Sequence, residues 1–195
     1  MDQYALSIAQ DELRTMLYAN ADFSTGRLRL GDYLFQNNDI PGAIKQYETA
    51  IKMDSLLLIV YSNLATAYSM NGDTASAFKT LNTLIKKDPK SGRAYYLRGL
   101  LNFEIKQEAL GISDMNKSIQ LDPANTRASY NLATLYYQNK EWNKAESAIK
   151  VALKTEPQNG DYRYLLALIY QEQGKTIQST TLMQQLQKEQ AQGRS

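Results

Sequence analysis

Tyrosine and arginine recur at a fixed interval in this chain, and both side chains are typical of surfaces that bind other proteins. The number of residues from Tyr96 to Tyr130 equals that from Tyr130 to Tyr164, and the same number separates Arg93 from Arg127. Tyr and Arg are enriched at the energetic centres of protein interfaces, and an arginine can pair with a carboxylate through two parallel hydrogen bonds. Such a set predicts recognition of a polypeptide rather than bond-breaking chemistry.

The residue types that most enzymes depend on are missing. The chain has no cysteine and no histidine among its 195 residues, which excludes disulfides, thiolate nucleophiles and iron–sulfur sites and removes the commonest general base and metal ligand. The acidic residues are scattered; Glu104 and Glu108 lie one helical turn apart, but a solvated helix face explains them. We therefore expect no enzymatic activity, no metal and no cofactor.

Charge and hydropathy narrow the function classes further. The net charge is +2, from 22 basic and 20 acidic residues, without the basic bias that predicts nucleic-acid binding. The longest apolar run, Leu56 to Tyr61, is six residues long, whereas a membrane span needs roughly 20. We expect no nucleic-acid partner and no membrane span, and a chain without cysteine suits the cytoplasm and the periplasm equally.

An internal repeat organises most of the sequence. The pairs Asp88-Pro89, Asp122-Pro123 and Glu156-Pro157 are spaced by the interval that separates the tyrosines. Apolar residues between them recur at intervals of three and four, which predicts amphipathic helices. Asp39 and Asp73 are expected to cap helix N-termini, and each proline pair is expected to end one repeat and turn the chain into the next.

The sequence resembles the tetratricopeptide repeat (TPR) family, whose repeat of about 34 residues has small and aromatic side chains at set positions. The resemblance rests on Gly31, Ala43 and Tyr47 in the first repeat and on matching residues in four more. These are Tyr61, Ala65, Tyr68, Ala77 and Leu81; Tyr95, Gly99 and Met115; Ala133, Tyr136, Ala145 and Ile149; and Ala167, Tyr170, Ser179 and Met183. The third repeat departs from the pattern at Arg98, Asn102 and Gly111.

The resemblance implies an all-α fold: a right-handed α-solenoid of about five helix-turn-helix repeats. The expected array covers residues 24–193, as 24–57, 58–91, 92–125, 126–159 and 160–193. Each repeat has a helix A and a helix B, brought close by small residues such as Gly31 and Ala65. Turns between A and B are expected at 38–39, 71–73, 140–141 and 174–175, whereas Lys106-Gln107 carries no turn signal.

Residues 4–19 also show helical periodicity, with Ile8, Leu13 and Leu17 on one face. In the repeat frame this segment matches a helix B without its helix A. Residues 1–23 therefore form either an orphan helix of a larger protein or an N-terminal capping helix, and both interpretations stay open.

The resemblance also implies a concave groove lined by the A helices. The residues expected to face it and bind a partner are Asn63, Arg93, Tyr96, Phe103, Arg127, Tyr130, Asn131, Tyr137 and Tyr164. Asparagine can hydrogen-bond the backbone of an extended peptide. The alternative is that tyrosines at this spacing pack between neighbouring A helices and are structural. TPR domains that clamp a chaperone's C-terminal carboxylate use five set residues; here only Asn63 and Arg93 match, so that function is set aside.

The expected function is non-catalytic binding of a protein or peptide segment in the groove. The rival interpretation is a structural or dimerisation region of a larger enzyme or envelope protein, without a groove ligand, for which self-association would be the signature. A second, weaker resemblance, carried by residues 26–55 and 160–175, is to the TPR tail of bacterial periplasmic multihaem cytochrome-type proteins. This second resemblance implies only the kind of larger protein in which the repeats would occur.

Overall fold

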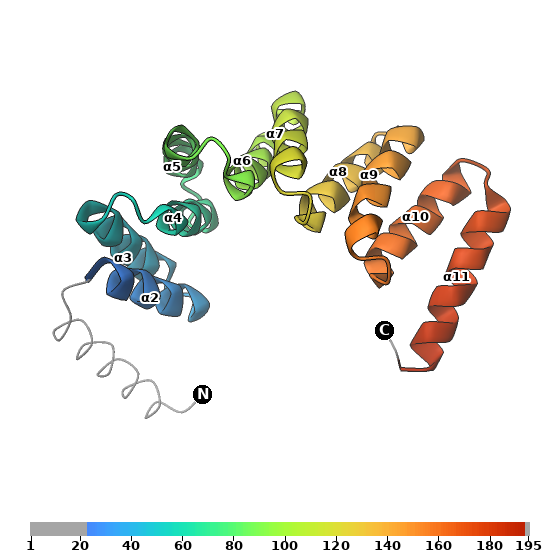
Figure 1. The fold of residues 1–195 in the computed structure, drawn as a ribbon, viewed down its shortest axis with the longest axis horizontal. Coiled ribbons are helices and arrows are strands. Elements are labelled where there is room, and N and C mark those ends of the chain that lie inside the picture. The colour runs from blue at the N-terminus through green and yellow to red at the C-terminus, as the bar shows by residue number, and fades with distance from the viewer. Residues whose placement is uncertain (1–22, 194–195) are drawn as a thin grey trace. The chain divides into compact units, whose positions relative to one another are not determined.

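The computed structural model describes residues 23–193, and every regular element in that range is an α-helix (Figure 1). The chain divides into two compact units, with the boundary between Ile105 and Lys106. The helices of unit 1 are α2 (Phe23–Gln36), α3 (Ile40–Met53), α4 (Leu58–Met70), α5 (Thr74–Lys87) and α6 (Gly92–Glu104). Those of unit 2 are α7 (Glu108–Leu121), α8 (Thr126–Gln138), α9 (Trp142–Thr155), α10 (Gly160–Glu172) and α11 (Thr176–Ala191). The expected helix at 4–19 lies outside the described residues.

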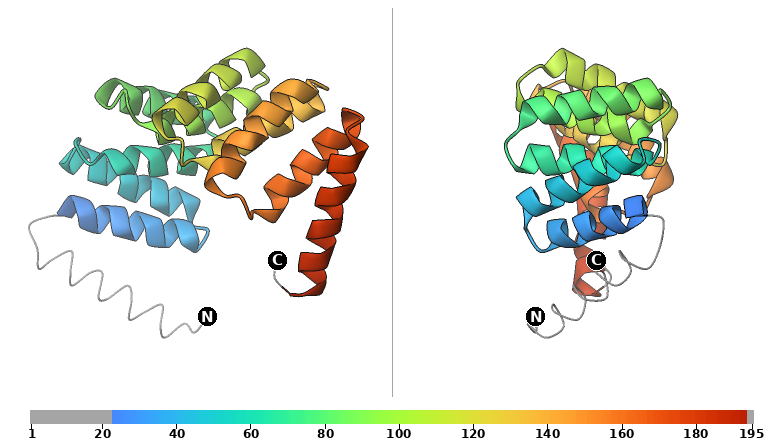
Figure 2. Two further views of the ribbon diagram at one scale, coloured as in Figure 1. Left: turned by 45° about the vertical axis from the view of Figure 1, so that its right-hand side comes forward. Right: turned by 90° about the vertical axis from the view of Figure 1, so that its left-hand side faces the viewer.

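The helices keep the period of the sequence. Helices α4, α6, α8 and α10 each have 13 residues, and each begins one repeat length after the one before. Helices α3, α5, α7 and α9 each have 14 residues and recur at the same interval. Within unit 1, α2 packs on α3 and α4 on α5; within unit 2, α8 packs on α9 and α10 on α11 (Figure 2). The predicted all-α fold of stacked helix pairs is confirmed.

The turns that join each helix A to the helix B that follows it in the chain repeat one backbone conformation. Asn38, Gly72, Lys106, Lys140 and Gly174 occur once in each repeat at equivalent positions, and all five have φ between +60° and +79°. Asp39 and Asp73 each accept a hydrogen bond at 3.0 Å from a backbone N–H of the helix that follows, which confirms them as N-caps. The turn at Lys106, which the residue types do not signal, has the same conformation as the other four.

Small residues bring the helices of a pair together, as expected. A Cβ atom on Gly31 would lie 2.5 Å from the Tyr47 ring, so α2 reaches α3 only because this position has no side chain. Ala43, Ala77 and Ala145 are completely buried at the matching position of three B helices, α3, α5 and α9. This close packing fixes the faces that the A helices turn outward.

Candidate functional site

A line of hydrogen bonds joins the three A helices of unit 1. Asn63 on α4 donates from Nδ2 to Oδ1 of Asp32 on α2 at 2.9 Å, and Arg93 on α6 donates from Nη2 to Oδ1 of Asn63 at 3.3 Å. The Tyr47 hydroxyl of α3 donates to the same Asp32 oxygen at 2.7 Å. Burial and then the bond to Asp32 raise the pKa of Tyr47, so this hydroxyl remains a donor. These bonds fix which way the Asn63 amide faces.

The line borders a small pocket on the A-helix side of unit 1. The pocket has a volume of about 230 Å³, and its lining consists of Asp32, Phe35, Gln36, Tyr47, Asn63, Thr66 and Arg93. Arg93 is exposed on its rim, and a guanidinium has five N–H donors. The pocket therefore combines an aromatic wall with amide, hydroxyl and guanidinium groups, which suits a polypeptide backbone or a carboxylate.

The structure brings two of the predicted groove residues of unit 1 together and places two others elsewhere. Asn63 and Arg93 are in contact and share the pocket. Tyr96 and Phe103 are partly buried further along α6 and do not line it. The sequence prediction omitted Asp32, although its place in α2 opposite Asn63 follows from the repeat frame.

In unit 2 two predicted tyrosines pack against neighbouring rings. The Tyr130 ring lies 5.2 Å from that of Tyr162 on α10, at an interplanar angle of 31°. The Tyr137 ring lies 5.2 Å from that of Trp142, at 56°. Burial, followed by the negative charge of Glu172, raises the pKa of Tyr137. The Tyr130 contact joins neighbouring A helices, as the structural alternative describes, whereas Tyr137 contacts the helix B that follows its own helix.

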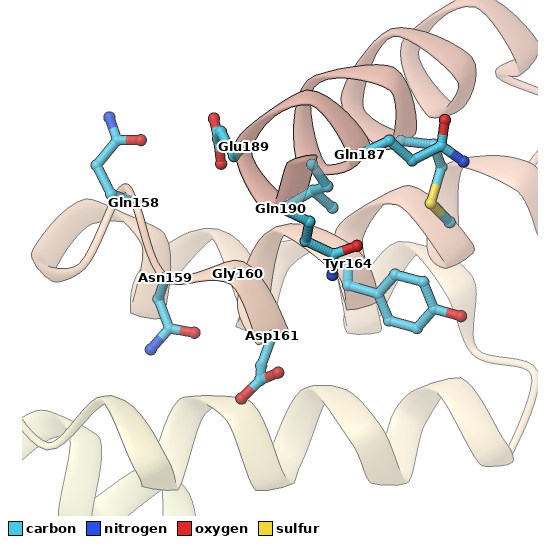
Figure 3. A pocket seen from close by; sticks show the side chains of 10 residues that line it. Gln158, Asn159, Gly160, Asp161, Tyr164, Gln187, Glu189 and Gln190 are labelled. Atoms are coloured by element: carbon cyan, nitrogen blue, oxygen red, sulfur yellow. The ribbon is translucent and has the colours of Figure 1, made fainter. Parts of the chain in front are cut away.

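The remaining predicted residues of unit 2 are more open. Tyr164 has 51% of its surface exposed, and Arg127 is exposed on α8, whereas Asn131 is partly buried. Tyr164 lies on the wall of a pocket of about 740 Å³ between the start of α10 and the end of α11 (Figure 3). The other residues of its lining are Gln158, Asn159, Gly160, Asp161, Met183, Leu186, Gln187, Glu189 and Gln190.

Polar contacts between the A and B helices were missed by the sequence prediction. In unit 1 the Tyr68 hydroxyl donates to Oε1 of Glu48 at 2.5 Å, and burial followed by this bond raises the pKa of Tyr68 to about 12. In unit 2 the equivalent ring, Tyr170, lies below the ammonium groups of Lys150 and Lys175, at 5.9 and 5.3 Å. The repeat frame aligns the two tyrosines, but it does not indicate the side chains that they contact.

Features of other classes of site are absent from the described part of the chain. Residues 23–193 contain no group of three or more acidic side chains placed to hold a metal ion. None of the helices in that range has the length and apolar character needed to cross a lipid bilayer.

Comparison with known families fits this geometry. Three models of the tetratricopeptide repeat match the chain, at residues 31–72, 60–91 and 107–169. The chain contains tetratricopeptide repeats. These matches give no support to the second resemblance, to the TPR tail of cytochrome-type proteins.

Individual relatives cover the repeats only in part. Hsp70-Hsp90 organizing protein of Triticum aestivum is 27% identical over 99 residues, which are 51% of this chain and 17% of that protein. Hsp70-Hsp90 organizing protein 3 of Arabidopsis thaliana is 27% identical over 96 residues, 49% of this chain and 17% of that protein. The chain thus spans about a sixth of these curated relatives.

Solved structures match over most of the chain. The crystal structure of MamA has a TM-score of 0.71 at 23% identity and covers 87% of this chain and 94% of that one. That of YrrB, described as a TPR protein with an unusual peptide-binding site, has a TM-score of 0.63 at 14% identity, with 89% and 90% covered. At these identities the likeness establishes the fold.

Proposed function

We propose that this TPR chain is a non-catalytic interaction module whose A-helix faces receive a segment of a partner protein. The observation that carries the proposal is the hydrogen-bonded line Asp32–Asn63–Arg93 beside an open pocket. The likeness to Hsp70-Hsp90 organizing protein and to YrrB, a TPR protein with an unusual peptide-binding site, supports a role in binding.

The geometry favours an extended segment at unit 1. Asp32 takes one N–H of the Asn63 amide and Arg93 donates to its oxygen, which leaves the second N–H to donate to a peptide carbonyl. Because the amide is held before the ligand arrives, little side-chain entropy is lost on binding. Arg93, exposed on the rim, can pair with a carboxylate of the partner. Phe35 gives the pocket an apolar wall.

The test uses peptides selected against the whole protein from a random 12-residue display library. Binding of the selected peptides is then measured by fluorescence anisotropy with the wild type and with Asn63→Ala. We expect the variant to bind about tenfold more weakly, close to 1.4 kcal/mol. Asn71→Ala, at an exposed turn position of the same helix pair, is the matched control.

Two outcomes would contradict the proposal. Equal binding to wild type and Asn63→Ala would mean that the peptide does not bind at the A-helix face of unit 1. Selection of no peptide, together with self-association in sedimentation velocity, would favour the rival interpretation of a dimerisation region without a groove ligand.

A further inference from the structure

One buried aromatic side chain of helix α10 contacts α8. Tyr162 has only 7% of its surface exposed, and its ring lies against that of Tyr130. Its hydroxyl donates to Oγ1 of Thr126 at 3.0 Å, and Thr126 in turn donates to Oε1 of Glu156 at 2.6 Å. Thr126, Tyr130 and Glu156 thus form a binding site for Tyr162, which is the third residue of the next A helix, α10.

The pocket between α10 and α11 is built from the same positions one repeat later. Gly160, Tyr164 and Gln190 follow Thr126, Tyr130 and Glu156 by one repeat length, and all three line the pocket. Met183 and Leu186 on its α11 wall follow Ile149 and Ala152 by the same interval, and Ile149 and Ala152 are completely buried. Tyr164, by contrast, is 51% exposed, so this second site is open to solvent.

We propose that this end pocket, lined by Tyr164, Met183, Leu186 and Gln190, receives an aromatic side chain from an amphipathic helix of a partner protein. The helix docks on α10 and α11 as α10 docks on α8 and α9. Insertion of apolar anchors from one helix face into a groove is an established mode of recognition. This surface differs from the unit 1 site of the proposed function, because α10 and α11 form it and its ligand is a helix.

The lining indicates the chemistry of the partner helix. Gly160 stands where the Tyr162 site has Thr126, so the end pocket has room for tyrosine or tryptophan. Gln190 stands where that site has Glu156, so a neutral amide replaces the carboxylate. Its charged residues are both acidic: Asp161 is exposed, and Glu189 is paired with Arg163 at 2.6 Å. A basic residue beside the aromatic one therefore complements Asp161.

A second copy of the chain is a poorer occupant. A head-to-tail contact that continued the stacking would offer the third position of α2 to the pocket, because α2 is the first A helix described. In the repeat frame that position is Gly26, and the same position in α4, α6 and α8 is Val60, Ala94 and Ala128. Among the A helices within residues 23–193, only α10 carries an aromatic residue there, and its tyrosine is already buried.

The probe for the test is a helix-stapled peptide with the sequence of residues 159–174, in which D161K supplies the basic residue. The chain has six methionines, and among those within residues 23–193 only Met183 lines the pocket. In the full chain labelled with ¹³C at the methionine methyls, we expect the Met183 signal to shift and saturate as peptide is added. Met53 and Met70, which are 50% and 58% exposed in unit 1, report non-specific adsorption and should not move.

Substitutions in the protein and in the peptide test whether the peptide binds in the end pocket. Leu186→Glu should abolish the Met183 shift, whereas Ile177→Glu, at an 81% exposed position of the same helix, should leave it unchanged. A peptide that also carries Y162A should bind at least tenfold more weakly. Asn63→Ala should have no effect here, so failure of the end pocket and failure of the unit 1 site are distinguishable.

Four results would overturn the proposal. Met183 could stay unmoved at millimolar peptide, the Y162A peptide could bind equally well, or Met53 and Met70 could shift along with Met183. In the fourth, the Met183 signal of the protein alone would move with protein concentration and Leu186→Glu would prevent it, which would make a second copy the occupant.

Discussion

Replacement of Gly31 by alanine should destabilise unit 1 by about 3 kcal/mol, because the added methyl group collides with a buried ring and displaces it from its hydrogen bond. The new Cβ would lie 2.5 Å from Cε1 and 2.7 Å from Cδ1 of Tyr47, and Tyr47 is only 1% exposed, so its ring has little room to withdraw. Overpacking of this kind costs typically about 1–3 kcal/mol. Movement of the ring would also break its 2.7 Å bond to Asp32, worth about 1.5–3 kcal/mol for a charged acceptor. The better helix propensity of alanine returns about 1 kcal/mol.

The assay is urea unfolding followed by circular dichroism at 222 nm. Gly160→Ala is the matched control, since Gly160 also lies in an A helix but a Cβ there meets no atom within 4 Å. The double variant Gly31→Ala/Tyr47→Leu should show a coupling energy above about 0.5 kcal/mol, because the shorter side chain relieves the collision. A Gly31→Ala protein as stable as the wild type would refute the reasoning.

Three further changes test other contacts. Asp73→Ala removes the cap bond to the Ser76 amide and should cost about 1 kcal/mol in urea unfolding; no change would mean that water replaces the cap. Glu146 is partly buried, which alone would raise its pKa, but bonds from lysine ammonium groups and from an amide lower the pKa to about 2. Its stabilisation is therefore complete above pH 4.5 and lost as the pH falls towards 2, so Glu146→Gln should flatten the acid limb of a stability-versus-pH curve. Arg163→Gln breaks the ion pair with Glu189 and should speed hydrogen exchange in the last turns of α11 while leaving α8 protected.

The repeat frame predicted more of the fold than the individual residue types did. Asn38 and Gly72 mark their turns because Asn and Gly tolerate positive φ. Lys106 and Lys140 adopt the same conformation, at φ +61° and +60°, although lysine gives no such signal. At Lys140 the turn joins α8 and α9, which pack on each other, so helix packing rather than residue type accounts for the backbone there. Counting one repeat length from Gly72 would have placed the turn that residue types left undefined.

The candidate site was less predictable, because facing a groove and packing on the next helix use the same residue types. Tyr130 and Tyr164 occupy equivalent positions, yet one ring lies against Tyr162 and the other is half exposed. The difference depends on the neighbour that each ring meets, which a single repeat does not encode. The contact of Asn63 with Asp32 likewise joins residues 31 positions apart.

The single tryptophan gives the chain an internal optical probe of cooperativity. Trp142 is the only tryptophan in 195 residues and lies against Tyr137 in unit 2, so its emission reports the unfolding of that unit alone. Helical circular dichroism reports both units. In repeat proteins, stability is a sum of local and nearest-neighbour terms, and the separation between the two unfolding midpoints therefore measures how strongly the halves of the chain are coupled.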